Sequence, residues 1–372
     1  MTRALASGLA FGLAAALAAG AAAAVFAQQP ATPAAAPARA TPVDPLAPKT
    51  SAESAAIGPL YAITLSTSDL AGVLKLYRDG LGMRVRGPIP AAADVERPLW
   101  GLAPSGTWEM YLLDRPAAPG AALVRVLVFP GSGETIRATW NPQEPGPFTI
   151  GFPTADLPAL DARLRRMGYE SLAPMERSRI PRPDGSTYGL LESVFRGPDR
   201  VHVVLVSRQD GMPQLGQVDP ATGHGGPAYS AQVVTDSDAV IAFYCQVLGL
   251  ELRSDREWKS GERSAIGLPA GTPFRLALLY APGATSGQLL LMDFRDRTAA
   301  PSGVAPRPPS RGIGIYTFPV KRLDDTAAQV RAAGAPVVHG PVTYDGGGLG
   351  LHRAMTVRAP NGVLVELVEL QR

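Results

Sequence analysis

The sequence has few of the side chains that form cross-links or bind metal ions. Its 372 residues include one cysteine, Cys245, and only four histidines. A single thiol excludes an intramolecular disulfide framework, and its place in the apolar stretch 239–250 predicts a small core residue. Charged residues make up 18% of the chain, the formal net charge is +3, and no block of Lys or Arg is present. We therefore expect no nucleic-acid partner.

Long apolar runs are also scarce, and the one that occurs lies at the N-terminus. Residues 1–27 contain one arginine and then a run of Ala, Leu and Gly that ends in Val-Phe-Ala. This pattern predicts a signal peptide cleaved after Ala27, and hence a periplasmic or secreted protein. The alternative is an uncleaved N-terminal anchor. No other segment is long and apolar enough to span a bilayer, so we expect no membrane span after cleavage.

Residues 28–57 are rich in proline and alanine and lack hydrophobic periodicity. Such a composition is typical of a semi-rigid linker that cannot bury a core.

The rest of the chain is repetitive. Residues 65–86 (LSTSDLAGVLKLYRDGLGMRVR) align with residues 233–253 (VVTDSDAVIAFYCQVLGLELR), and the alignment places Asp69 opposite Asp236. Both stretches predict a strand, an Asp or Ser helix start, an amphipathic helix and a glycine at the helix end.

A second pair of repeats has the same form. Residues 152–169 (FPTADLPALDARLRRMGY) align with residues 318–335 (FPVKRLDDTAAQVRAAGA), and 197–206 parallels 359–368 further along. Each unit therefore predicts a βαβββ module whose helix covers one face of its sheet. Two modules joined edge to edge would curl into a concave sheet around a cavity.

Four such modules predict an α+β fold of two domains. We expect an N-terminal domain at 58–209 (modules 1 and 2), a linker at 210–226, and a C-terminal domain at 227–372 (modules 3 and 4).

The last predicted strand, APNGVLVELVEL (359–370), contains an unusual acidic residue. Successive strand residues point to opposite faces, so Glu366 shares a face with Leu364, Val368 and Leu370. Burial of an unpaired carboxylate costs several kcal/mol. The Glu366 carboxylate must therefore pair with Arg or Lys, bond to a polar neighbour such as Tyr229 or His352, or stay protonated with a raised pKa.

With this strand, the stretches ITLSTSDLAGVLKLYRDGLGMRV and VVTDSDAVIAFYCQVLGLEL make the chain resemble the vicinal oxygen chelate superfamily. Glyoxalases, extradiol dioxygenases, and fosfomycin and bleomycin resistance proteins belong to that superfamily. The resemblance covers nearly everything after residue 58 and supports the four-module fold. Members carry out different chemistry on one scaffold, so the site residues must decide the function.

The resemblance implies where metal ligands would lie. Metal-using members carry His, Glu or Gln near the start of a module's first strand and Glu on its last strand. Glu366 falls on the last-strand position of module 4. The first-strand positions of the four modules hold Ala62, Thr149, Tyr229 and Ile315. The last-strand positions of modules 1 and 2 hold Arg125 and Val204, and module 3 has apolar residues with Asp293 nearby. The usual first-strand ligands are therefore missing.

The histidines offer one further candidate. We expect His224 to be solvated, His339 to lie at the surface and His202 to be a core residue. His352 opens the strand beside that of Glu366, so these two residues are the candidate ligands of a divalent metal ion.

The predicted site therefore lies in the C-terminal domain. Glu366 is the candidate catalytic base or carboxylate ligand, and Tyr229, His352 and Tyr316 are the candidate substrate-binding residues, with core positions as the alternative for the two tyrosines. One hypothesis is a lyase, isomerase or dioxygenase-type enzyme acting on a small oxygenated substrate. A second is a protein that sequesters a small molecule, and a third is a structural envelope protein without a cavity.

Overall fold

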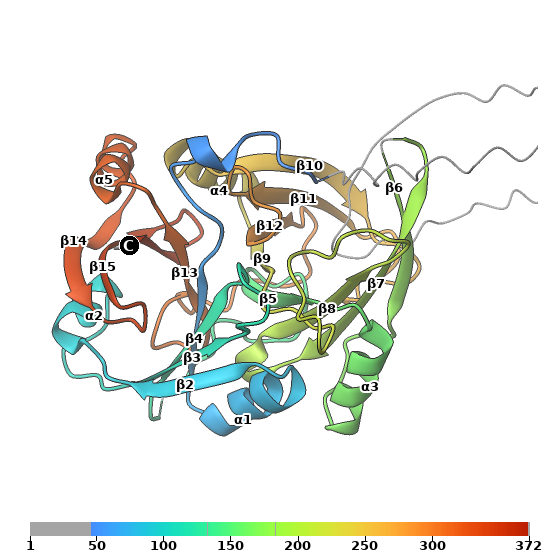
Figure 1. The fold of residues 1–372 in the computed structure, drawn as a ribbon, viewed down its shortest axis with the longest axis horizontal. Coiled ribbons are helices and arrows are strands. Elements are labelled where there is room, and N and C mark those ends of the chain that lie inside the picture. The colour runs from blue at the N-terminus through green and yellow to red at the C-terminus, as the bar shows by residue number, and fades with distance from the viewer. Residues whose placement is uncertain (1–45, 132, 183, 371–372) are drawn as a thin grey trace, which may run out of the picture.

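The computed structural model describes residues 46–370, except 132 and 183 (Figure 1). The predicted signal peptide and most of the predicted linker lie outside the described residues. The described residues form two eight-stranded sheets with helices against them. This architecture confirms the predicted α+β fold of four βαβββ modules in two domains.

The first sheet contains the strands of modules 1 and 4. Its strand order is β14-β15-β16-β13-β1-β4-β3-β2. The bounds of its strands are β1 Ala62–Thr67, β2 Arg84–Ile89, β3 Glu109–Asp114, β4 Leu123–Val128, β13 Gly312–Pro319, β14 Val337–Asp345, β15 Leu351–Arg358 and β16 Leu364–Leu370.

The second sheet contains the strands of modules 2 and 3. Its strand order is β10-β11-β12-β9-β5-β8-β7-β6. The bounds of its strands are β5 Gly146–Pro153, β6 Glu176–Pro181, β7 Thr187–Arg196, β8 His202–Arg208, β9 Tyr229–Val234, β10 Glu251–Lys259, β11 Pro273–Tyr280 and β12 Gln288–Asp293.

The pairing of modules differs from the prediction. Strand β1 pairs with β13, Ala62 opposite Thr317, and β5 pairs with β9, Gly151 opposite Tyr229. Module 1 therefore shares a sheet with module 4, and module 2 with module 3. The prediction of one domain from modules 1 and 2 and another from modules 3 and 4 was wrong. Residues 210–226 connect two modules of one sheet rather than two domains.

Helices cover the convex faces of both sheets (Figure 1). The helices are α1 Leu70–Leu74, continued by the π-helical turn η2 Lys75–Gly80, α3 Leu157–Arg166, α4 Ser237–Ala242, continued by the π-helical turn η4 Phe243–Val247, and α5 Leu323–Ala332. Their apolar residues and those of the convex faces form the largest core cluster, against which Cys245 packs half-buried as predicted. None of the helices in the described part of the chain has the length and apolarity needed to cross a membrane.

Aspartate side chains begin three of these helices. The carboxylates of Asp69, Asp156 and Asp236 each accept a hydrogen bond from the backbone N–H three residues later, at 2.9 to 3.0 Å. Such an N-cap satisfies a donor that the helix itself leaves free. The aligned aspartates at 69 and 236 therefore predicted two of these helix starts correctly.

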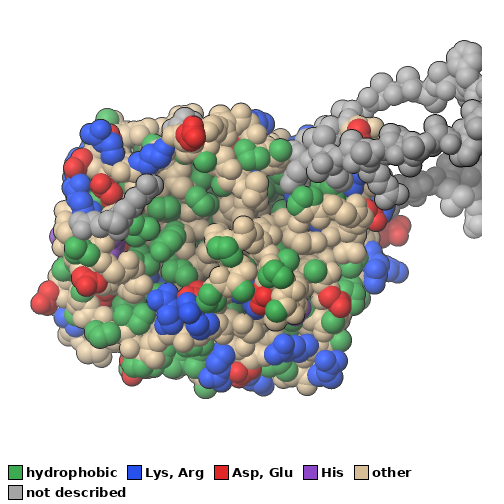
Figure 2. Space-filling model, viewed as in Figure 1, with side chains coloured by type: hydrophobic (Ala, Val, Ile, Leu, Met, Phe, Trp, Pro, Cys, Tyr) green, Lys and Arg blue, Asp and Glu red, His purple; other side chains and the backbone are tan. Residues whose placement is uncertain are grey.

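The concave face of each sheet is filled by side chains rather than left open. On the first sheet, α2 (Ala93–Leu99) lies between β2 and β3 in the chain and contributes Leu99 and Trp100 to the cluster on the concave face. On the second sheet, residues 265–268 and Leu46 pack into the corresponding cluster. Figure 2 shows hydrophobic side chains gathered in a depression on one face of the molecule.

Candidate functional site

The centre of the first sheet holds a buried ion pair between Arg125 and Glu366. Arg125 Nη2 lies 2.9 Å from Glu366 Oε2, and neither side chain has any exposed surface. In the parallel register, Arg125 is the partner of Thr64 and Glu366 is the partner of Thr317. Thr64 and Thr317 are equivalent first-strand positions of modules 1 and 4. The ion pair therefore joins the equivalent last-strand positions of the two modules.

Both oxygens of the Glu366 carboxylate accept hydrogen bonds. Trp100 Nε1 donates to Oε1 at 2.8 Å, and Thr317 Oγ1 donates to Oε2 at 2.7 Å. Burial alone would raise the pKa of Glu366, but the charge of Arg125 and the hydrogen bonds from Arg125, Trp100 and Thr317 together lower it. Glu366 is thus paired with an arginine and ionised. The alternatives of a protonated carboxyl or a bond to Tyr229 or His352 are excluded.

A second buried carboxylate, Glu96 of α2, belongs to the same cluster. Its Oε1 accepts a 2.7 Å hydrogen bond from the Gly347 N–H. Burial raises the pKa of Glu96, and the charge of Glu366 adds to this, while the Gly347 N–H and Arg125 oppose it. The Trp100 ring lies 5.3 Å from the Arg125 guanidinium carbon, a cation–π distance. The Arg125 guanidinium therefore stabilises the charge of two carboxylates, Glu366 and Glu96, and lies next to an aromatic ring.

Several polar atoms on this concave face have no hydrogen-bond partner among the described residues. The atoms are Thr64 Oγ1, Ser66 Oγ, Glu96 Oε2, Trp108 Nε1, Arg125 Nε and Nη1, Tyr344 Oη, His352 Nε2 and Thr356 Oγ1. Buried polar groups in native proteins are nearly always satisfied, by protein, ordered water or ligand. Ordered water or a bound polar molecule would satisfy such atoms.

His352 and Tyr316, both predicted here, do not reach Glu366. His352 pairs with Leu370, four residues further along β16, so the two residues are about 13 Å apart at 3.3 Å per residue. The His352 ring instead packs against the Tyr344 ring, with the ring centroids 4.5 Å apart and the planes tilted by 53°, and its Nδ1 lies 2.7 Å from the Gly350 carbonyl oxygen. Tyr316 precedes Thr317 and faces the convex side, where its hydroxyl lies 2.8 Å from Ser230 Oγ. The predicted substrate-binding role of Tyr316 beside Glu366 was wrong.

Tyr229 lies in the other sheet. It is fully buried on the concave face of the second sheet, and Gly151 leaves its ring room: a Cβ at Gly151 would lie 2.1 Å from Tyr229 Cε1. Burial raises the pKa of Tyr229, and Glu192 and Tyr280 add to the effect. Tyr229 therefore cannot contact Glu366, because module 3 pairs with module 2.

The remaining histidines divide between correct and incorrect predictions. His202 is buried between Trp140 and Phe148, which confirms a core position. His224 is only half-exposed, with Nδ1 2.9 Å from Thr154 Oγ1, so the prediction of a solvated side chain was wrong. His339 is half-buried within β14.

The residues around Glu366 do not fit a divalent metal ion. Among the described residues, no group of three or more His, Cys, Asp or Glu could hold a metal. Arg125 places a positive charge directly against the Glu366 carboxylate, where it would repel a metal ion. The equivalent last-strand positions of the second sheet are Val204 and Leu290, both buried and apolar. The predicted metal-ligand roles of Glu366 and His352 do not fit this geometry.

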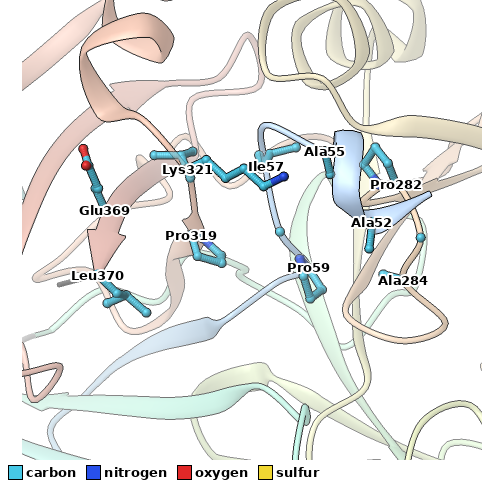
Figure 3. Close-up of a pocket in the computed structure, with 13 residues that line it drawn as sticks. Ala52, Ala55, Ile57, Pro59, Pro282, Ala284, Pro319, Lys321, Glu369 and Leu370 are labelled. Atoms are coloured by element: carbon cyan, nitrogen blue, oxygen red, sulfur yellow. The ribbon is translucent and has the colours of Figure 1, made fainter. Parts of the chain in front are cut away.

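A separate cavity of about 600 Å³ lies between the two sheets (Figure 3). Its walls come from residues 52–59, 282–284 and 319–321 and from the end of β16. Figure 3 shows Lys321 and Glu369 as its charged side chains, among alanines and prolines. Glu366 does not line this cavity.

Sequence reasoning missed Glu96 and Trp100. Both lie in or next to α2, in the stretch AAADVERPLW, which has no strong helical periodicity and contains Pro98 within the helix. Their spacing of four residues, which places both on one helix face, was the available signal.

Comparisons with known proteins agree with this fold. Residues 226–367 match the family model described as Glyoxalase/Bleomycin resistance protein/Dioxygenase superfamily. These residues run from β9 to β16 and so supply one module to each sheet. None of the curated proteins compared with the chain matches it.

Solved structures resemble the whole two-sheet architecture. A mutant of glyoxalase I from Zea mays matches with a TM-score of 0.53 and 17% identity, covering 85% of this chain and 95% of that chain. A putative dioxygenase from Bacillus subtilis matches with a TM-score of 0.54 and 13% identity, covering 86% and 87%. At such identities the likeness shows the fold alone, and it confirms the predicted resemblance at that level.

Proposed function

Since the chain belongs to the vicinal oxygen chelate superfamily through residues 226–367, we propose that it binds a small oxygenated molecule without a metal ion. The proposed site is the concave face of the first sheet beside Arg125. The observation that carries the proposal is the group of partnerless buried polar atoms around Arg125 and Tyr344. Such atoms are unfavourable unless a polar molecule satisfies them.

Arg125 is the residue best suited to hold this ligand. Its Nη2 is held by Glu366, and its Nε and Nη1 remain as donors for an acceptor oxygen. Because the guanidinium is planar and permanently charged, it presents these donors in a fixed geometry. Glu366 then acts as a positioning residue that keeps the guanidinium charged and in place.

The enzyme hypothesis receives less support from this arrangement. A general base near neutral pH needs a raised carboxylate pKa and a free oxygen. The lowered pKa of Glu366 and its three hydrogen bonds leave it a poor base. A binding role is therefore the better-supported proposal, with small-molecule sequestration as its biological form.

We also propose that the mature protein is exported. The support is the Ala-rich apolar stretch of residues 1–27 with small residues before the expected cut. N-terminal sequencing of the protein recovered from the periplasm should begin at Gln28; an intact Met1 would contradict export by this route.

The binding proposal can be tested with benzamide and catechol, two small oxygenated aromatic probes. We expect either probe to raise the melting temperature in a concentration-dependent manner, with or without EDTA. Tyr344→Phe removes a hydroxyl from the site and should weaken binding about tenfold, the effect of one lost hydrogen bond.

The matched control is Tyr316→Phe, which removes a buried hydroxyl from the opposite face of the same sheet. It should leave probe affinity unchanged. Probe stabilisation that disappears with EDTA, or that responds equally to both variants, would overturn the proposal, as would a failure of both probes to stabilise the protein.

A further inference from the structure

The loop between β14 and β15, residues 346–350 (GGGLG), lies in the proposed site. We propose that this loop is a displaceable plug, whose Gly347 peptide group stands where a polar group of the ligand binds. The inference rests on the proposed binding function and adds how the site is closed. It also predicts which ligand chemistry replaces the loop.

The neighbours of the loop glycines show how closely the loop packs into the site. A Cβ at Gly347 would lie 3.1 Å from Tyr344 Oη and 3.7 Å from Arg125 Nη2. A Cβ at Gly348 would lie 2.5 Å from Leu112 Cδ1 and 3.1 Å from Ile89 Cδ1. The loop backbone therefore reaches the guanidinium that we assign to the ligand, and at Gly348 it does so only because no side chain is present.

The loop is held by hydrogen bonds and by one apolar side chain. The Gly347 N–H donates to Glu96 Oε1, the Leu349 N–H donates to the Gly346 carbonyl oxygen within the loop, and the Gly350 carbonyl oxygen lies 2.7 Å from His352 Nδ1. Leu349 packs half-buried against the cluster on the concave face. Gly347, Gly348 and Gly350 have positive φ angles of 60°, 72° and 77°. A glycine-rich segment loses much conformational entropy when it is ordered, so its displacement recovers part of that entropy.

The atoms left behind by the loop define the ligand that would replace it. Glu96 loses a donor, and the Arg125 and Tyr344 groups gain access to an acceptor. The ligand should therefore carry an N–H or O–H group next to a carbonyl oxygen. A neutral molecule fits better than an anion, because Glu96 and Glu366 already place two carboxylates around one guanidinium. Benzamide has this chemistry, and benzoate is its anionic counterpart.

The test compares Gly348→Ala with Gly350→Ala in the full chain. Both positions have similar positive φ, so both substitutions strain the loop backbone equally. Only the methyl group introduced by Gly348→Ala would meet Leu112, because nothing lies within 4 Å of a Cβ at Gly350. Relative to Gly350→Ala, we expect Gly348→Ala to speed hydrogen exchange of the Gly347 amide about tenfold and to tighten benzamide binding by a similar factor.

A second pair of variants tests the hydrogen bond between Gly347 and Glu96 without altering the loop. Glu96→Ala removes the acceptor of the Gly347 N–H, and Glu96→Gln keeps one. Faster exchange of the Gly347 amide is expected in Glu96→Ala, while in Glu96→Gln the exchange should stay closer to that of the parent protein.

The outcomes separate this inference from the proposed function. If the Gly347 amide exchanges at the same rate in Gly348→Ala and Gly350→Ala, the conclusion that the loop is packed into the site is wrong. Faster exchange without tighter benzamide binding would overturn the plug and leave the binding proposal intact. If benzamide binds to none of the proteins, or benzoate binds better, the plug and the ligand chemistry assigned here are both wrong. Catechol stabilisation would then still support the binding proposal.

Discussion

The guanidinium of Arg125 and the carboxylate of Glu366 meet at 2.9 Å, from equivalent strands of two modules that lie at opposite ends of the chain. The cation that lies against the Glu366 carboxylate is therefore a side chain of the protein itself. The charge of Glu366 at the centre of the first sheet is thus balanced by Arg125.

Removal of one member of the Arg125–Glu366 ion pair should destabilise the protein. Arg125→Leu leaves the Glu366 carboxylate buried without its cation, and loss of one member of a buried pair typically costs about 3–5 kcal/mol. We expect a decrease of that size in the free energy of unfolding, measured by urea denaturation. The double variant Arg125→Leu with Glu366→Leu should recover most of it. A single variant as stable as the parent would mean that the pair is not buried as described.

Chelation should have no effect on the protein. Because the cluster already contains its own cation and lacks a set of three ligands among the described residues, metal removal has nothing to disturb. The melting temperature of the purified protein is expected to be the same before and after EDTA. Elemental analysis should find no stoichiometric transition metal. One equivalent of iron, manganese, zinc or nickel, removed with a fall in melting temperature, would contradict this assignment.

Burial of Glu96 should make the stability of the fold depend on pH. Arg125, Glu366 and Tyr344 are the charged and titratable groups around this carboxyl, and burial raises its pKa in the folded protein. The contribution of Glu96 to stability is therefore complete below the ordinary carboxyl pKa and is lost as the pH rises through the raised value. The free energy of unfolding, measured by urea denaturation, should fall with rising pH over that range. Glu96→Gln should remove this part of the pH dependence; an unchanged slope in that variant would assign it to another group.

A second pH effect is expected from the other sheet. Glu176 on β6 is buried, accepts a hydrogen bond from the Ala265 N–H at 2.7 Å, and has a pKa raised to about 7 by burial. Its contribution to stability is complete below the ordinary carboxyl pKa of 4.5 and is lost as the pH rises through 7, with a total of about 3 kcal/mol. Urea denaturation at pH values on either side of this range should show the loss. Glu176→Gln should flatten the profile between these values, and a profile that stays unchanged would mean that Glu176 titrates normally.

The module pairing predicts how the two halves of the chain behave when they are separated. A fragment of residues 210–372 holds modules 3 and 4, whose partners β5 and β1 lie in the other half. We expect no cooperatively unfolding monomer from this fragment. When it is mixed with residues 46–209, a one-to-one complex with native circular dichroism should form. A stable monomeric fragment of residues 210–372 would contradict this pairing and support modules 3 and 4 as one domain.

The sequence predicted each module well and their pairing poorly. Repeated aspartates at 69 and 236 predicted helix starts because capping is a local interaction. The choice of partner depends on strand edges that all four modules share, so the sequence of one module does not determine which other module it meets. The prediction paired modules that follow each other in the chain. The structure instead pairs module 1 with module 4 and module 2 with module 3.

The site was predicted in part. The alternation along β16 predicted that Glu366 faces a buried row, and a partner of opposite charge was one of the alternatives considered. Arg125 could not be identified as that partner, because the contact spans 241 positions and depends on the module pairing. Glu96 was not predicted for the same reason, because its hydrogen-bond partner, the Gly347 N–H, belongs to a loop in module 4.

The nested pairing also orders events during synthesis. Strand β1 emerges early, yet β13, its neighbour, follows about 250 residues later. At about 5–20 residues per second, the first module waits roughly 10–50 seconds with an unpaired strand edge while the two inner modules can already close on each other. A chain built in this way is exposed to mispairing until its last quarter is made. A chaperone that holds the nascent first module would therefore shield this edge until its partner appears.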